Sequence, residues 1–572
     1  MHLRSLSLRN YRLYRSVDLE FPDGLVGIYG ANGSGKCLPG HVRVYDADAG
    51  GMVPISQFVA ESRKRTLGLS AEQIQPVRVV DWLVLGERAT VLVTLRNGAR
   101  LEVAETHPIL TDQGCVQAKD LTADHWVAEA AVVPTLGPHR VTVDEALLLG
   151  LLLGDGSLSA TGIVLTAGNV AVADLYRELV ERLFPGATVG SIARAGTSAR
   201  QLYVRSMLDA DGRRRILLQL LQRFHEVGVP LERYVRSGNL VGVRRGHRGL
   251  AWDTLCAIED DYGVDLFAER CALYPARAVR SWVEQLGLLG ATAGRKHVPS
   301  DLLTLPDEQT WALLGGLWLT DGWISVGSGT VDVGLCTKSW QLACDVRALL
   351  RRVGIRSSIR GQNVAQRRYW NVAVATDGHA RLRFMPLVGV KAERRDRILG
   401  LPVTSRRGTN GDMIPPSFNQ SIRSWTSDVG TSRSPKQRHH PMNRATFREF
   451  AGAASVADQE TVWSRVASVK PTGKSVPCYD LEVDTDEHLY LAESFVVHNS
   501  TLIEALRYGL YGDSRTDKWE LRTVGVGEDV RVELVFEHEG NTYDVRRRLK
   551  GRNLTPEVEV YLNGQLAAQS VR

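Results

Sequence analysis

The sequence predicts a multidomain protein in which a long insertion divides an α/β nucleotide-binding fold. Three observations support this. The chain has 572 residues, several times the roughly 150 residues of one domain. A phosphate-binding loop breaks off after Lys36, and its missing part stands at Ser500. Between these points one short glycine-rich pattern occurs twice, which indicates a duplicated unit.

The composition is typical of a folded protein without a membrane segment. Hydrophobic residues make up 44% and charged residues 23% of the chain, which excludes wholesale disorder and a collagen-like protein. The longest nearly unbroken apolar run, residues 146–154, is about half of a membrane span, and no apolar signal core follows the basic N-terminus. The seven cysteines form no CxxC pair, which excludes a disulfide framework or a zinc knuckle. We therefore expect a cytoplasmic protein without a membrane partner.

The phosphate-binding loop is incomplete where it first occurs. Residues 25–30 read as a short buried strand, and residues 30–36 follow it with the P-loop spacing GxxxxGK. The next residue is Cys37, and the turn after it cannot begin the helix whose amides would hold phosphates. The hydroxyl and an apolar helical pattern appear only from Ser500 onward. Joining the two parts restores a site for ATP and Mg²⁺, with Ser500 on the metal, formed by Gly30, Asn32, Gly33, Gly35, Lys36, Ser500 and Thr501.

The insert, residues 37–499, carries the groups that its own removal needs. Cys37 can attack the carbonyl of Lys36 to give a thioester, and Ser500 can then take over the acyl group. Asn499 can cyclise onto its own carbonyl and release the insert. His498 precedes this asparagine, and a histidine suits proton transfer near neutral pH. The alternative is a glycine-rich turn followed by an unrelated helix.

These ends resemble those of an intein, with CLPG at residues 37–40 and VVHN at residues 496–499 followed by serine. Residues 101–111 and 477–499 resemble two further intein motifs. The resemblance implies an all-β Hint (Hedgehog/intein) splicing domain built from residues 37–140 and 461–499.

The resemblance also assigns roles inside this domain. It implies that His107 activates the first peptide bond, that Asp480 tunes the thiol and that His488 handles a further proton. Ala104 stands where the family usually has threonine, which removes a hydrogen bond of about 1 kcal/mol from the first step. Splicing by this route requires no cofactor.

The middle of the insert contains the repeated pattern, LLGLLLGDG at residues 148–156 and LGGLWLTDG at residues 314–322. Each copy has small residues four apart, which lie on one face of a helix. Two such helices can pack closely, and each ends in an aspartate, Asp155 or Asp321. Neighbouring carboxylates are tolerable when cations lie between them. The alternative is a pair of ordinary buried helices.

This pattern resembles the single-chain LAGLIDADG homing endonucleases, and residues 141–400 are expected to form an α+β domain with pseudo-twofold αββαββ halves. The resemblance implies Mg²⁺-dependent cleavage of double-stranded DNA, with Asp155 and Asp321 on the metal and Lys296 and Lys391 as catalytic lysines. The expected target is the insert-free host gene at the P-loop codons. Several arginine clusters between residues 200 and 400 suit a phosphate backbone, although each alone equally fits a solvated surface. A decayed nuclease that only binds DNA is the alternative, and residues 401–460 are expected to be a linker.

The host consists of residues 1–36 and 500–572. Its later part alternates apolar and polar residues, with turns near residues 539–541 and 563–564, and predicts strands and hairpins. Together with the P-loop, this resembles the N-terminus of the SbcC and SMC group of ATPases, and implies dimerisation at full length and pairing with a nuclease subunit. No Walker B aspartate follows, so a fragment or truncated host is expected. A P-loop ATPase with an inert insert is a further alternative.

Overall fold

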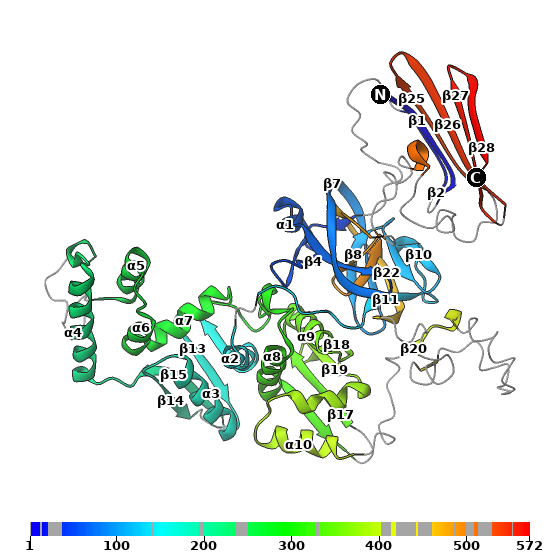
Figure 1. Ribbon diagram of the computed structural model, residues 1–572. Coiled ribbons are helices and arrows are strands. Elements are labelled where there is room, and N and C mark those ends of the chain that lie inside the picture. Colours follow the sequence, from blue (N-terminus) through cyan, green and yellow to red (C-terminus); the bar gives the residue numbers. More distant parts are fainter. Residues whose placement is uncertain are drawn as a thin grey trace. The chain divides into compact units, whose positions relative to one another are not determined.

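The computed structural model divides into two compact units, residues 1–137 with 412–572 and residues 138–411 (Figure 1). The residues it describes are 2–11, 14–20, 37–138, 141–193, 196, 199–234, 250–327, 331–401, 413–418, 442–443, 460–485, 488–498, 508–512, 529–551 and 553–571. The predicted residues that lie outside this description are Gly30, Asn32, Gly33, Gly35, Lys36, Asn499, Ser500 and Thr501.

The two host segments form one antiparallel sheet of six strands, in the order β2-β1-β25-β26-β27-β28. In Figure 1 the blue β1 and β2 lie beside the red strands from the far end of the chain. The predicted hairpins are confirmed: Glu539, Gly540, Asn563 and Gly564 all have positive φ, as two-residue hairpin turns require. The strands are β1 (His2–Tyr11), β2 (Tyr14–Glu20), β25 (Val530–His538), β26 (Asn541–Lys550), β27 (Thr555–Leu562) and β28 (Gln565–Val571).

A second, twelve-stranded antiparallel sheet is formed from segments on both sides of residues 138–411. Two strands of 23 residues each, β7 and β22, pair with each other in this sheet. One continuous cluster of buried apolar side chains forms the core of the domain. The elements of this domain are β3 (Leu38–Pro39), β4 (Arg43–Tyr45), β5 (Met52–Pro54), α1 (Ile55–Ala60), β6 (Arg65–Ser70), β7 (Gln73–Leu95), β8 (Arg100–Ala104), β9 (Pro108–Thr111), β10 (Gly114–Gln117), η1 (Ala118–Asp120), β11 (Trp126–Ala130), β22 (Thr461–Val483), β23 (Leu489–Ala492) and β24 (Phe495–His498).

Residues 138–411 contain two αββαββ halves with equivalent sheets, β12-β13-β15-β14 and β16-β17-β19-β18, as the resemblance to the LAGLIDADG endonucleases implies. The first half comprises α2 (Val143–Asp155), β12 (Gly156–Ser159), β13 (Gly162–Ala167), α3 (Val170–Leu183), β14 (Ala187–Ala193) and β15 (Arg200–Ser206). The second comprises α8 (Asp307–Thr320), β16 (Gly322–Val326), β17 (Val331–Thr337), α9 (Trp340–Arg352), β18 (Ser357–Val364) and β19 (Arg367–Val374).

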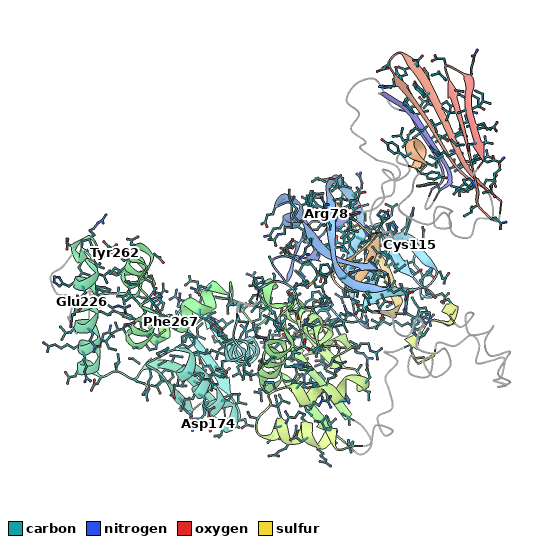
Figure 2. The ribbon with its side chains drawn as sticks, in the orientation of Figure 1. Arg78, Cys115, Asp174, Glu226, Tyr262 and Phe267 are labelled. Carbon is teal, nitrogen blue, oxygen red and sulfur yellow. The ribbon has the colours of Figure 1, made fainter. Side chains whose placement is uncertain are left out.

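The two halves are followed by different elements. After the first half, three helices build a separate apolar core, which no pattern in the sequence predicts. Labels on Glu226, Tyr262 and Phe267 mark these helices in Figure 2. The remaining elements are α4 (Ala210–Val227), η2 (Leu231–Arg233), α5 (Trp252–Tyr262), α6 (Phe267–Leu273), α7 (Pro275–Gln285), η3 (Ser300–Leu302), η4 (Thr376–Phe384), α10 (Val390–Leu399), β20 (Met413–Ile414), η6 (Pro416–Phe418) and β21 (Met442–Asn443). Within the described ranges, no helix has the length and apolar character that crossing a bilayer needs.

Candidate active sites

The first site surrounds the Cys37 thiol, which is buried in the β-rich domain. Strand β3 begins at the next residue and pairs with β22, so that Pro39 lies opposite Cys478. Cys37 and Cys478 share a small buried cluster with Ala104. The amide of Ala104 donates a hydrogen bond of 3.1 Å to the Cys37 carbonyl oxygen. Although Ala104 lacks the expected hydroxyl, its backbone therefore holds the nucleophile's residue in place.

The environment of Cys37 keeps its thiol protonated. The Cys478 thiol, which accepts a hydrogen bond from Cys37, raises the pKa of Cys37, and burial and the Asp480 carboxylate act in the same direction. The same hydrogen bond lowers the pKa of Cys478. Of the two, Cys478 is therefore the sulfur that loses its proton first. Cys478 is not among the residues predicted from the sequence. It lies two residues before Asp480 on one strand, so the two side chains are on the same face, and this spacing could have indicated its role.

His107 follows the strand that carries Ala104. It is fully buried, its amide donates to the Ala104 carbonyl at 2.9 Å, and its own carbonyl accepts from Ala118 at 2.8 Å. The backbone of Ala104 connects His107 with Cys37, because its amide donates to the Cys37 carbonyl and its carbonyl accepts from the His107 amide. The structure thus links His107 to the residue of the nucleophile through Ala104, although His107 and Cys37 are far apart in sequence.

The residues of the rear end gather in the same domain. Strands β23 and β24 pair Leu489 with His498, and the rings of His488 and His498 lie 6.1 Å apart. Val497, next to His498, pairs with Ile109, two residues after His107. This register connects the rear end of the insert to the strand beside the first site.

Asp480 is also buried here, and one of its partners, Tyr490, is not among the residues predicted from the sequence. The hydroxyl of Tyr490 donates a hydrogen bond of 3.0 Å to Oδ1 of Asp480, and the Leu481 amide donates to the same oxygen at 2.9 Å. Burial and the negative charge of Asp480 raise the pKa of Tyr490 well above its ordinary value. Tyr490 therefore remains a hydrogen-bond donor that orients this carboxylate.

The second site lies at the ends of two closely packed helices, α2 and α8. A Cβ atom on Gly150 would lie 2.9 Å from the Cα of Gly316, and one on Gly316 would lie 2.7 Å from the Leu151 nitrogen. Backbones can approach this closely only where no side chain intervenes. The small residues of the repeated pattern therefore bring Asp155, the last residue of α2, and Asp321, which follows α8, to neighbouring helix ends.

The two lysines occupy equivalent positions at these helix ends. Nζ of Lys296 donates to the carbonyls of Leu152 and Gly154, at 3.0 and 2.5 Å. Nζ of Lys391 donates to the carbonyls that end α8 and begin β16, those of Trp318, Thr320 and Gly322, at 2.5, 3.1 and 2.8 Å. The lysines donate to carbonyls at the C-terminus of each helix and place positive charge there.

These four side chains perturb one another. Burial raises the pKa of Asp321 to about 6, assisted by the charge of Asp155, and burial also raises the pKa of Asp155. Burial lowers the pKa of Lys296 and of Lys391 to about 8. Two neighbouring carboxylates that disfavour each other's charge suit a divalent cation, which prefers oxygen ligands. Among described residues, no group of three or more His, Cys, Asp or Glu could hold a metal.

Comparisons with known proteins found one family model and several similar solved structures. Residues 308–389 match the family model of the LAGLIDADG-like domain. This part of the chain, which includes nearly all of α8 as well as Asp321, is therefore similar to a LAGLIDADG-like domain. Similar solved structures include a DnaB intein from Synechocystis sp. PCC 6803, at 16% identity over 16% of this chain and 68% of that one, with a TM-score of 0.15. They also include I-DmoI in complex with DNA and Ca, at 12% identity over 45% of this chain and 97% of that one, with a TM-score of 0.23.

Three curated relatives illustrate the sequence likeness. The replicative DNA helicase DnaB of Rhodothermus marinus is 24% identical over 81% of this chain and 46% of its own length. The A subunit of DNA gyrase from Mycolicibacterium flavescens is 26% identical over 37% of this chain and 41% of its own. Protein RecA of Mycobacterium tuberculosis H37Rv is 25% identical over 58% of this chain and 34% of its own. The chain thus spans less than half of each.

These relatives bear on the host. The expected SbcC or SMC-like host is not supported, because the matches carry the names DnaB, DNA gyrase and RecA. A P-loop and a few hairpins are common to many nucleotide-binding proteins, so these features do not single out one host family.

Proposed function

We propose that this chain is a precursor that removes residues 37–499 by autocatalytic protein splicing and joins residues 1–36 to residues 500–572. The observation that carries the proposal is that both ends of the insert belong to one β-rich domain, which also contains Cys37, His107 and Asp480. A passive insertion would not need a buried thiol at its first residue with histidines near each end.

The reaction uses only groups of this chain. Cys37 Sγ attacks the Lys36 carbonyl, the peptide bond breaks, and the thiol proton moves to the released Cys37 amine with His107 as the proton carrier. The Ser500 hydroxyl then takes the acyl group and restores the thiol. The side-chain amide nitrogen of Asn499 attacks the main-chain carbonyl of the same residue, which closes a succinimide and breaks the peptide bond to Ser500. The freed amine of Ser500 then converts the ester to a peptide bond. His488 and His498 are assigned to the proton transfers of this rear cleavage.

Mass spectrometry of the expressed chain tests the proposal. The wild-type chain should yield residues 1–36 joined to 500–572, together with the free insert. A Cys37→Ala, Asn499→Ala double variant should stay a single unspliced chain, and Asn499→Ala alone should retain the rear junction. A folded wild-type chain that stays intact would favour the P-loop ATPase with an inert insert.

For the excised insert we assign the cleavage of double-stranded DNA. Asp155 and Asp321 would hold Mg²⁺, which when bound supplies positive charge to the phosphate under attack. The ammonium groups of Lys296 and Lys391 fix the adjacent helix ends and contribute further positive charge to the phosphate. Duplex DNA with the insert-free host sequence across Lys36 and Ser500 is the substrate to test. Mg²⁺-dependent cleavage that Asp321→Asn abolishes supports the assignment, whereas binding without cleavage indicates a decayed nuclease.

For the ligated host we assign binding and hydrolysis of ATP with Mg²⁺, through the rejoined P-loop. The DnaB match covers 81% of this chain, about the share that residues 37–499 occupy. Because the relatives also carry three different names, we attribute the likeness to the insert rather than to the host. Nucleotide binding by the purified ligated product tests the host assignment.

A further inference from the structure

The host sheet contains strands from both sides of the insert, and its pairing does not depend on a continuous host chain. Strands β1 and β2, from the front segment, form a hairpin that lies on β25, the first strand of a four-stranded meander from the rear segment. Partners across the β1–β25 boundary include Leu6 with Leu534 and Leu8 with Val532. The addition of a hairpin to the edge of a sheet is a common mode of binding between separate chains.

The boundary between the two segments has a buried apolar core. Leu6, Leu8 and Tyr11 from the front segment are each 0% exposed and share a cluster with Val532 and Leu534 from the rear segment. These side chains could not be buried by either segment alone, because the cluster draws on both. Burial of apolar surface is the main favourable contribution to association.

Polar and aromatic contacts reinforce this boundary. Arg4 forms an ion pair with Glu537 at 2.9 Å, and the Asn10 side-chain amide donates to the Asp529 carbonyl at 3.1 Å. The ring of Tyr11 lies 6.0 Å from that of Tyr508, only eight residues after Ser500. The rear junction is therefore attached through a short segment to the sheet that holds the front segment.

The same sheet holds the chain that comes after the rear junction. The guanidinium of Arg547, on β26, donates to the carbonyls of Gly509 at 3.0 Å and Leu510 at 3.3 Å. The segments from Glu20 to Cys37 and from His498 to Tyr508 are short. Short connections keep two tethered groups at an effective concentration of the order of millimolar.

We propose that the host sheet is assembled before excision and acts as a non-covalent clamp, which retains the front host segment on the rear one when the chain between them is cut. The binding surface is the β25 edge, and its partner is the β1–β2 hairpin of the same protein. Resting on the proposed function, the clamp would also keep a prematurely cleaved front segment within reach of Ser500.

A cut that is independent of splicing tests the clamp. We would place a protease recognition sequence between Glu20 and Cys37, in a chain that also carries Cys37→Ala and Asn499→Ala. After proteolysis at micromolar concentration, the front fragment should co-elute with the rest of the chain in size-exclusion chromatography and separate only in denaturant. Separate elution of the fragment in native buffer would overturn the inference, whether or not the chain splices.

Matched substitutions locate the retention to the β1–β25 boundary. Leu8→Asp places a charge in the buried cluster and should weaken retention at least about tenfold. Leu566→Asp makes the same change on β28, where the side chain is 54% exposed, and should leave retention unchanged. Equal release by both variants would contradict the assigned surface.

Adding the front segment as a separate peptide distinguishes a lost contact from a misfolded sheet. The rear segment of the Leu8→Asp chain is wild type, so a synthetic peptide of residues 1–20 added after the cut should bind it. Failure of the wild-type peptide to bind would show that the rear segment has no preformed edge, and would also overturn the proposal.

Discussion

Substitution of Gly150 by alanine tests whether the close approach of α2 and α8 forms the nuclease site. The new Cβ would lie 2.9 Å from both the Gly316 Cα and the Leu317 nitrogen, and closer still to the Leu313 carbonyl oxygen. Carbon atoms in favourable contact are about 3.5–4.0 Å apart, so the helices must separate by at least about 0.6 Å. Every opposing atom is backbone, which cannot rotate aside as a side chain can.

Two effects of this substitution compete. Alanine favours a helix over glycine by up to about 1 kcal/mol. Overpacking of a filled core costs about 1–3 kcal/mol, and the rigid backbone contacts place Gly150 in the upper part of that range. We therefore expect the free energy of unfolding of the nuclease unit to fall by about 1–2 kcal/mol. Separation of the helix ends should also reduce DNA cleavage, because it moves Asp155 away from Asp321.

Urea unfolding and Mg²⁺-dependent cleavage measure the two consequences. Gly162→Ala is the matched control, because a Cβ there has no atom within 4 Å. Splicing should be unaffected in both variants, since residues 138–411 form a separate compact unit. If Gly150→Ala left stability and cleavage at wild-type levels, the close-packed helix interface would not be the basis of the site.

Three further predictions concern the active sites and the host. Cys478→Ala removes the main cause of the raised pKa of Cys37. Thiol-induced cleavage after Lys36 should therefore reach half its maximum at a lower pH. An unchanged pH profile would contradict the effect of Cys478 on Cys37. DNA cleavage should decline as the pH falls through about 6, because Asp321 then gains a proton and can no longer hold a cation; cleavage rates between pH 5 and 8 measure this, and a flat profile would argue against it. A Cys37→Ala precursor should bind no ATP in equilibrium dialysis, unlike the ligated product; equal binding would refute the idea that splicing completes the nucleotide site.

Short-range patterns predicted much of the architecture. The hairpins of the host follow from turn residues between alternating strands, and the close packing of α2 on α8 follows from the repeated helix pattern. The two aspartates lie at neighbouring helix ends as expected, and Lys296 and Lys391 lie beside them. In each case the predictive residues are close in sequence or belong to a pattern that repeats.

Other features had no local signal. The three-helix core at residues 210–274 comes after the first half. Among the described residues, no equivalent core follows the second half, so the repeated pattern could not predict it. Tyr490 looked like any core aromatic residue until the fold placed its hydroxyl on Asp480. The SbcC or SMC-like host is not supported, and the sequence did not specify the host because its strongest motif is shared by many proteins.

The sequence by itself determined the two ends of the insert, the broken P-loop and the duplicated glycine-rich helices, because each is defined by residue type and local spacing. Only the tertiary structure decided that Cys478 faces Cys37, that His107 joins them through Ala104 and that β1 pairs with β25 across the whole insert. Those contacts depend on the register between strands that are far apart in the sequence. Register is fixed by the burial of whole faces in a shared core, which no short stretch of sequence specifies.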